Sequence, residues 1–246
     1  MSKGFYIITG TSRGIGESLA MMLLEKEHHV FGISRGMSDI LSRYKNYSHY
    51  NYDLSDTANI GQLLKGILEQ LKIEETVMIC LINNAAMLEP LKSIENCEPE
   101  EISKSLDINL IAPIVMSSCF IKLTDHLKVR RKIVNITSGA GVHPLEDMSM
   151  YCTAKAGLNM FTRCVGVEQA GNENPIEIIA VDPGMVETEM QKTARGKSSD
   201  AFAMANFFKE AFTNGDLQSP EALAVDLDRI IANEYETGKL INHDNR

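Results

Sequence analysis

The sequence contains no arrangement of cysteine or histidine that indicates a metal centre or a disulfide framework. Its cysteines are odd in number, and no two of them have CxxC spacing: Cys80, Cys97, Cys119, Cys152 and Cys164. The six histidines include no HExxH pattern. We therefore expect free thiols in a reducing compartment and no bound metal.

Long apolar runs and an excess of positive charge are also missing. The apolar run at residues 5–8 is too short for a signal peptide, and no stretch approaches the length that crosses a bilayer. Lys and Arg number 24 against 33 Asp and Glu, which gives a formal net charge of -9. An acidic surface repels nucleic acid and anionic membrane, so we expect neither as a partner. A cytoplasmic location is then the default expectation.

What the sequence does contain is an alternation of short apolar runs and longer segments with helical spacing. The runs predict strands at residues 5–9, 29–34, 48–52, 77–83, 132–137, 176–181 and 239–241, with helices at 15–26, 60–71, 100–123, 149–169 and 219–235. This alternation is typical of a doubly wound, Rossmann-type α/β fold, in which helices cover both faces of a parallel sheet. We expect one domain over residues 1–246, with a dinucleotide-binding part over about 1–140 and a catalytic and substrate part over about 138–246.

The first predicted strand runs into a glycine-rich turn, TGTSRGIG at residues 9–16, which opens a helix. Free backbone N–H groups and the helix dipole at such a turn bind a pyrophosphate. Gly10 suits a tight turn, while Gly14 and Gly16 leave room for the phosphates and for helix packing. Such a turn can be purely structural, but its position in the first βα unit favours a dinucleotide site.

The end of the second strand indicates which dinucleotide is bound. Arg35 stands where an acid would select NAD, Arg13 comes from the glycine-rich turn, and no acid follows until Asp39. Two cations near one 2′-phosphate favour NADPH, the alternative being two solvated surface arginines. Asp53, after the third strand, stands where it can hold the adenine amino group.

Tyr151 and Lys155 carry the strongest chemical signal, because residues four apart share one face of a helix. Ser138 ends the fifth strand upstream of them. Reduction of a carbonyl leaves an alkoxide that needs a proton, and a lysine ammonium lowers the pKa of a neighbouring tyrosine from about 10. A serine hydroxyl in the same place polarises the substrate oxygen. We therefore predict Tyr151 as the proton donor of a carbonyl reductase.

In this order, the motifs resemble the short-chain dehydrogenase/reductase family over essentially the whole chain. TGTSRGIG is followed by NNAA (83–86), a variant of the family's NNAG with Ala86 in place of glycine, and then by Asn109, Ser138, YCTAK (151–155), Pro183-Gly184 and Thr188. The resemblance implies that Asn109 holds a water in a proton relay to Lys155, and that Lys155 binds the nicotinamide ribose. It implies these cofactor contacts: Gly10, Ser12, Arg13, Gly14, Ile15, Gly16, Ser34, Arg35, Asp53, Asn84, Ala85, Tyr151, Lys155, Pro183, Gly184, Val186 and Thr188.

Within the family, four segments resemble the benzil reductase and sepiapterin reductase branch: ITSGAG (136–141), HPL (143–145), MYCTAKAGLNMF (150–161) and PGMVETEMQ (183–191). Its members reduce a carbonyl beside another carbonyl. The implied function is NADPH-dependent reduction of an α-dicarbonyl, such as benzil to benzoin, or of a pterin side chain. Asp244 lies in the region where an acid anchors the pterin. Relatives pair the helices that begin near residues 100 and 149, which implies a homodimer or homotetramer.

The longest connection, residues 188–220, is expected to set substrate specificity. Its apolar part, residues 201–212, fits either a lid that excludes water or an ordinary packed helix. Met148, Met185 and Met190 fit either an adaptable pocket wall or core positions.

Charged residues near these motifs are expected to be solvated. Glu187 and Glu189 fit a turn better than an acid/base pair, and the basic run at 128–132 fits a loop. Two other functions remain open. One is a 3-oxoacyl or hydroxysteroid-type dehydrogenase of the same fold. The other is a non-catalytic NADPH-sensing regulator, which the presence of both Tyr151 and Lys155 disfavours.

Overall fold

Seven short strands form one parallel sheet in the computed structural model, which describes residues 3–71 and 76–242. The strands are β1 (Lys3–Thr9), β2 (His29–Ser34), β3 (Tyr47–Asn51), β4 (Thr76–Asn83), β5 (Arg130–Ile136), β6 (Glu177–Asp182) and β7 (Lys239–Asn242). Their order across the sheet is β3-β2-β1-β4-β5-β6-β7, and every pair of neighbours is parallel. The predicted Rossmann-type α/β fold is therefore confirmed.

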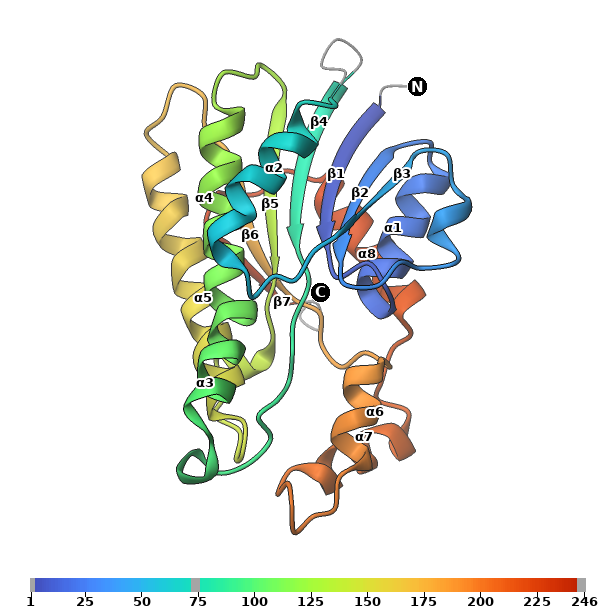
Figure 1. Cartoon of the computed structure of the whole chain (residues 1–246), viewed down its shortest axis with the longest axis vertical. Coiled ribbons are helices and arrows are strands. Elements are labelled where there is room, and N and C mark those ends of the chain that lie inside the picture. The colour runs from blue at the N-terminus through green and yellow to red at the C-terminus, as the bar shows by residue number, and fades with distance from the viewer. Residues whose placement is uncertain (1–2, 72–75, 243–246) are drawn as a thin grey trace.

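Helices connect the strands and cover both faces of the sheet (Figure 1). They are α1 (Gly14–Glu25), α2 (Ile60–Leu68), α3 (Pro99–Leu106), α4 (Ala112–Thr124), α5 (Ser149–Gln169), α6 (Glu189–Gly196), α7 (Ala205–Asn214) and α8 (Pro220–Ala232). The central strands β1 and β4 carry near-continuous apolar runs because both of their faces are buried.

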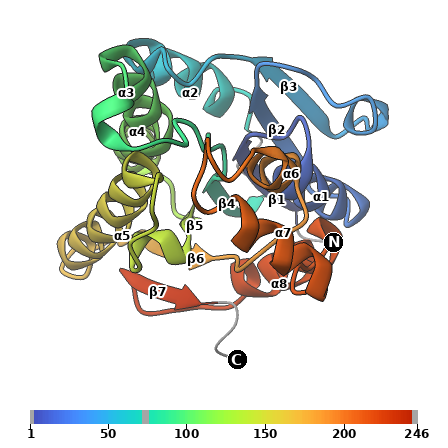
Figure 2. The ribbon, with the colours of Figure 1, turned by 90° about the horizontal axis from the view of Figure 1, so that it is seen from below.

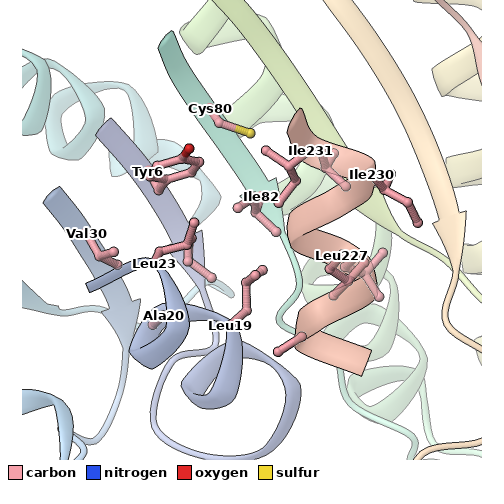
Figure 3. Packing of buried hydrophobic residues seen from close by; sticks show 14 of the residues in the cluster. Tyr6, Leu19, Ala20, Leu23, Val30, Cys80, Ile82, Leu227, Ile230 and Ile231 are labelled. Atoms are coloured by element: carbon pink, nitrogen blue, oxygen red, sulfur yellow. The ribbon is translucent and has the colours of Figure 1, made fainter. Parts of the chain in front are cut away.

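One face of the sheet packs against α1 and α8. Leu19 and Leu23 of α1 meet Leu227 and Ile231 of α8 above Ile82 of β4, as Figure 3 shows. The spacing of these leucines gives each helix a single apolar face, and that face is turned toward the strands.

The opposite face packs against α2, α4 and α5. Leu64 of α2, Met116 and Phe120 of α4 and Val165 of α5 belong to one buried cluster with the strand residues beneath them. The two clusters together enclose the sheet, which fixes where each strand ends and hence where the functional side chains stand.

The segment Pro99–Thr124 differs in two ways from its expected form. A π-helical turn, Asp107–Ile111, divides the predicted single helix into α3 and α4. By length and composition the segment is also apolar enough to cross a membrane, so the expectation that no stretch reaches that length is wrong. A core helix of a globular domain passes the same test, and Met116 and Phe120 are fully buried against the sheet.

The basic run at 128–132 is the other correction, because Arg131 and Lys132 are buried rather than solvated. They belong to β5, which begins at Arg130. The Lys132 ammonium lies 2.7 Å from a carboxylate oxygen of Glu177. It also donates 3.0 Å to the backbone oxygen of Ile230, at the end of α8. Lys132 thus closes the C-terminus of that helix, where a positive charge is favourable.

The carboxyl ends of the strands form one edge of the sheet, and α6 and α7 lie beyond this edge (Figures 1 and 2). In the sheet, β2 lies on one side of β1 and β4 lies on the other. The order of the strands therefore reverses between β1 and β4, and the crevice of a doubly wound fold opens at the carboxyl ends of these two strands. The sequence does not predict α6. The signal was present, because Thr188 accepts a hydrogen bond from Gln191 N as an N-cap residue, and Glu189 follows in the first turn.

Candidate active site

Two adjoining cavities open at the carboxyl ends of the strands. The larger measures about 650 Å³ and the smaller about 380 Å³, sizes typical of small-molecule sites. The residues common to both walls are Ile15, Asn84, Ala86, Leu88, Thr188 and Met190. The cavities therefore adjoin, and a ligand that fills the larger one lies against residues that also line the smaller.

The glycine-rich turn forms one wall of the larger cavity. Gly10 has a φ of +77°, which L side chains rarely adopt, and a Cβ there would lie 2.9 Å from Cα of Ala85. A Cβ on Gly16 would lie 2.4 Å from the Gly10 oxygen. At the start of α1, Arg13 provides no side-chain cap, so the first N–H groups of the helix remain for an anion. These features fit the pyrophosphate of a dinucleotide.

Asn84 fixes the two strand ends that flank this crevice. Its amide nitrogen donates 2.9 Å to the Thr9 oxygen, and the Thr9 hydroxyl accepts from Ala85 N at 3.0 Å. Asn84 also lines both cavities, so it can contact a ligand while its side chain holds the turn. Its neighbour Asn83 turns into the sheet instead, where it donates 2.8 Å to Asn135 Oδ1.

The wall of the larger cavity also includes four of the predicted cofactor contacts. Ser34, Arg35 and Asp53 line it, and Arg13 joins them from the glycine-rich turn. Both arginines are exposed, and neither forms an ion pair with any residue in the described part of the chain. Asp53 accepts a hydrogen bond from the Ser55 backbone N–H at 3.0 Å, which lowers the pKa of its carboxyl group.

Ser138, Tyr151 and Lys155 lie together in the wall of the smaller cavity. Ser138 lies close enough to the Tyr151 hydroxyl to influence its pKa. The Lys155 ammonium lies 5.6 Å from the centroid of the Tyr151 ring and donates 2.8 Å to the Ile136 oxygen. Tyr151 is 8% exposed and Lys155 2%. Three residues from one strand end and one helix therefore present a hydroxyl pair and an ammonium to the same apolar space.

The family model described as short chain dehydrogenase matches residues 5–199. The chain belongs to the short-chain dehydrogenase family.

Within this family, one relative is the benzil reductase ((S)-benzoin forming) of Bacillus cereus, 37% identical over 98% of this chain and 99% of its own length. The sepiapterin reductase of Bos taurus is 25% identical over 98% of this chain and 95% of its own. These two names confirm the branch that the sequence resembles. As a short-chain dehydrogenase, the protein is an oxidoreductase that acts on CH–OH and C=O groups with a nicotinamide cofactor, and its relatives make it a carbonyl reductase.

Solved structures show the same fold. YIR035C, a short-chain dehydrogenase/reductase from Saccharomyces cerevisiae, superposes with a TM-score of 0.82 at 20% identity, over 98% of this chain and 96% of that one. A 4-hydroxyisoleucine dehydrogenase complexed with NADH gives a TM-score of 0.79 at 22% identity, over 97% and 96%.

Burial sets the protonation of the two central groups of this short-chain dehydrogenase. It raises the pKa of Tyr151 to about 12, although the neighbouring Ser138 hydroxyl acts in the opposite direction. The expectation that the tyrosine pKa is lowered is therefore wrong for the free protein, because desolvation outweighs the neighbouring groups. Burial also lowers the pKa of Lys155 to about 8, and the carboxylate of Asp182 opposes this shift. Near pH 7 the tyrosine keeps its proton and most of the lysine is charged.

Asn109 occupies the π-helical turn and is fully buried, but its side chain faces the segment after β4. Its oxygen accepts from Met87 N at 2.9 Å, and its amide nitrogen donates 2.9 Å to the Met87 oxygen. The side chain thus clamps Met87, which lines the larger cavity. Asn109 and Gly16 are the two sequence-predicted site residues that line neither cavity wall.

Pro183, Gly184 and Val186 line the smaller cavity, as expected. Asp182, which the sequence analysis missed, lines it as well and accepts from Gly184 N at 3.0 Å. The signal was an acid immediately before the Pro-Gly turn. Asp244, the other acid considered near the substrate, lies outside the described residues.

The segment after Thr188 lines the smaller cavity with the apolar side chains of Met190, Phe207 and Phe208. Two methionines that precede Thr188, Met148 and Met185, line it as well. Phe202 is fully buried and stacks on Phe208 with ring centroids 5.9 Å apart, so this part is a packed core. Phe207, by contrast, is 46% exposed while it lines the cavity. Residues 201–212 therefore pack on the core and also contribute to the cavity wall, whereas a role as a lid stays a prediction.

Glu187 and Glu189 form ion pairs with basic residues of α6. Glu187 binds Arg195 through two contacts of 2.7 Å, which lowers the pKa of its carboxyl group. The Arg195 guanidinium also lies 4.1 Å from the centroid of Phe212. Glu189 pairs with Lys192 at 2.6 Å on the surface.

Proposed function

We propose that the protein is an NADPH-dependent reductase of α-dicarbonyl compounds, with benzil or a sepiapterin-like pterin as the type of substrate. The observation that carries this proposal is the Ser138–Tyr151–Lys155 cluster, which lines a largely apolar cavity next to the proposed dinucleotide cavity. The benzil reductases of Bacillus cereus and Bacillus subtilis, 37% and 35% identical, support the substrate class.

The proposed mechanism assigns a separate task to each residue. The hydroxyls of Ser138 and Tyr151 hold the substrate oxygen, and Tyr151 donates the proton as negative charge develops on it. The ammonium of Lys155, 5.6 Å from the centroid of the Tyr151 ring, stabilises the resulting phenolate by its charge. When bound, the nicotinamide supplies the hydride. Met148, Met185 and Phe208 exclude water from the reacting atoms. Both polar atoms of the Asn109 side chain are hydrogen-bonded to the backbone of Met87. In the proposed relay, the backbone of Asn109 must therefore hold the water.

The preference for NADPH rests on Arg13 and Arg35. Both line the larger cavity, and their guanidinium groups have no acidic partner among the described residues. Arginine matches a phosphate with two parallel hydrogen bonds, so this pair suits the 2′-phosphate that distinguishes NADPH from NADH. The remaining proposed cofactor contacts are Gly10, Ser12, Gly14, Ile15, Gly16, Ser34, Asp53, Asn84, Ala85, Tyr151, Lys155, Pro183, Gly184, Val186 and Thr188.

We also propose that the protein works in the cytoplasm as a homodimer or homotetramer. In this assembly, α4 and α5 of one subunit pack against the same helices of its partner. Ile111 precedes α4 with 37% exposure, and Met160 and Val167 on α5 are 56% and 80% exposed, so these helices present apolar side chains to a partner. Size-exclusion chromatography with light scattering tests the assembly.

The dinucleotide-binding part is assigned to about residues 1–140 and the catalytic and substrate part to about 138–246.

The test of function follows NADPH absorbance with purified protein. The substrate panel contains benzil, 1-phenyl-1,2-propanedione, sepiapterin, a 3-oxoacyl thioester and a ketosteroid, and each assay is repeated with NADH. We expect turnover of the diketones or the pterin, and faster turnover with NADPH. Turnover of the thioester or the steroid alone would replace the proposed substrate class. Tight NADPH binding without turnover on any carbonyl would favour the regulator.

A further inference from the structure

Asp147 and Glu27 are the two described residues other than glycine that have a positive φ. The φ of Asp147 is +60°, a conformation that costs free energy for most side chains and that aspartate and asparagine adopt more readily. Asp147 stands between β5 and α5, directly before Met148, which is 2% exposed and lines the smaller cavity. An uncommon backbone conformation so close to the site indicates that Asp147 has a local task.

Asp147 joins three segments that lie far apart in the sequence. Its carboxylate oxygen Oδ1 accepts a hydrogen bond from the Ser93 hydroxyl at 3.0 Å, and Oδ2 accepts one from Ala203 N at 2.8 Å. Its backbone oxygen accepts from Lys92 N at 3.0 Å. These segments are the connection after β4, the connection before α5 and the connection before α7. Each of them adjoins a residue in the wall of the smaller cavity, namely Leu88, Met148 and Phe208.

Residues 197–216 contain α7 and supply Phe207 and Phe208 to the wall of the smaller cavity. Within the described part of the chain, they form one hydrogen bond to a residue outside α6 and this segment, which is the bond from Ala203 N to Asp147. Their remaining contacts with the core are apolar, and apolar contacts are not directional. The carboxylate of Asp147 is therefore the polar contact that sets where α7 stands.

We propose that Asp147 is a positioning residue for carbonyl reduction, whose carboxylate holds residues 197–216 where Phe207 and Phe208 complete the wall of the smaller cavity. The inference rests on the proposed function, because the same cavity binds the carbonyl compound. The catalytic hydroxyls and ammonium stand after β5 and on α5, so loss of the contact leaves them in place. The expected result is a higher KM for the carbonyl compound, with little change in kcat or in the Kd for NADPH.

Two substitutions separate the side-chain contacts of Asp147 from its backbone conformation. Asp147→Asn keeps both, because its amide oxygen can accept from Ala203 N while its amide nitrogen donates to the Ser93 hydroxyl, and asparagine tolerates a positive φ. Asp147→Gly keeps the conformation but loses both contacts. With 1-phenyl-1,2-propanedione, well below the Tm, we expect Asp147→Gly to raise the KM about fivefold and Asp147→Asn to change it less than about twofold. Glu27→Gly, the matched change at the other positive φ, lies outside both cavity walls and should leave the KM unchanged.

Ala203→Pro removes the donor on the other side of the contact. Ala205 N donates 3.0 Å to the Phe202 oxygen, and Met204 has a φ of -79° and a ψ of 0°. These values fit a type I turn, whose second position, here Ala203, favours proline. We expect Ala203→Pro to raise the KM about fivefold, and the double variant with Asp147→Gly to be no worse than Asp147→Gly alone, because both break one contact. Additive losses would overturn the inference.

Hydrogen–deuterium exchange separates this inference from the proposed function, because it needs no substrate. We expect the backbone N–H groups of α7 to exchange about fivefold faster in Asp147→Gly and Ala203→Pro than in the wild type, while those of α8 keep the wild-type rate. Asp147→Asn should exchange like the wild type throughout. If this pattern appears in a protein that reduces no carbonyl, the proposed function fails and the role of Asp147 in holding α7 stands. Wild-type exchange in Asp147→Gly, an unchanged KM in that variant of an active enzyme, or an equal rise of KM in Asp147→Asn would each overturn the inference.

Discussion

Lys155 donates a 2.8 Å hydrogen bond from its ammonium group to the backbone oxygen of Ile136, the last residue of β5. This contact ties the catalytic helix to the strand end that carries Ser138, and it holds the charge 5.6 Å from the centre of the Tyr151 ring. The distance between the proton donor and its charged neighbour is therefore set by the junction of a helix and a strand rather than by a flexible loop.

The first prediction concerns the pH dependence of catalysis. Burial lowers the pKa of Lys155 to about 8 and raises that of Tyr151 to about 12. In the reduction direction, kcat/KM should fall as the pH rises through about 8, because the ammonium that stabilises the phenolate loses its proton. The tyrosine remains protonated throughout this range. A profile of kcat/KM from pH 6 to 10 measures this, and a flat profile would show that the charge of Lys155 is not needed.

The same shift predicts how stability changes with pH. The pKa of Lys155 is lower in the folded chain than its ordinary 10.5, so between about 8 and 10.5 the unfolded chain binds more protons. Stability from this group therefore rises with pH across that window. Lys155→Met should remove the rise, as measured by urea unfolding at pH 7.5 and 9.5. An identical pH dependence in the variant would contradict the assigned pKa.

The second mutational prediction concerns Arg13 and Arg35. Each Arg→Ser substitution should raise the Kd for NADPH roughly tenfold, because a charge-assisted contact to the 2′-phosphate is lost. The Kd for NADH should change less than about twofold, since NADH has no such phosphate. Titration of nicotinamide fluorescence measures both values. Arg43→Ser is the control, because Arg43 lies outside the wall of the larger cavity. Equal losses for the two cofactors would argue against NADPH selection.

Arg195 is predicted to position α6 and α7 for substrate binding. It joins Glu187 and the Phe212 ring, so Arg195→Met should raise the KM for ketones roughly fivefold while the Kd for NADPH stays the same. Glu187→Gln should have a similar effect, and the double variant should be no worse than either single one, because both break one interaction. Additive losses would show that the two residues act separately.

Lys132 is predicted to act on stability alone. Lys132→Met leaves the partly buried Glu177 carboxylate with Arg130 as its remaining ion-pair partner, and it removes the cap of α8. The Tm should fall by roughly 10 °C, whereas kcat measured well below the Tm should stay the same. Lys65→Met, which breaks an exposed pair at 4.0 Å, serves as the control and should change little. A Tm equal to that of the wild type would show that the buried pair contributes nothing net.

The sequence predicts the sheet and the placement of Tyr151 and Lys155 because both depend on local periodicity. Continuous apolar runs mark buried strands, and a spacing of four puts two side chains on one helical face. Neither signal shows how a polar side chain is satisfied. Lys132 reads as a solvated residue but is buried by Glu177 and the end of α8, which lie far away in sequence. Similarly, desolvation raises the pKa of Tyr151. The sequence does not predict this shift, because desolvation depends on all the side chains around the cavity and not on a local pattern.

The most direct test of the central claim compares the wild type with Tyr151→Phe, using NADPH and 1-phenyl-1,2-propanedione. The substitution removes one hydroxyl and keeps the ring that lies near Lys155. We predict that the wild type oxidises NADPH with the diketone, and that the variant binds NADPH with the same Kd but turns over at least about 100-fold more slowly. Comparable turnover in the variant, at unchanged cofactor affinity, would contradict the assignment of Tyr151 as the proton donor.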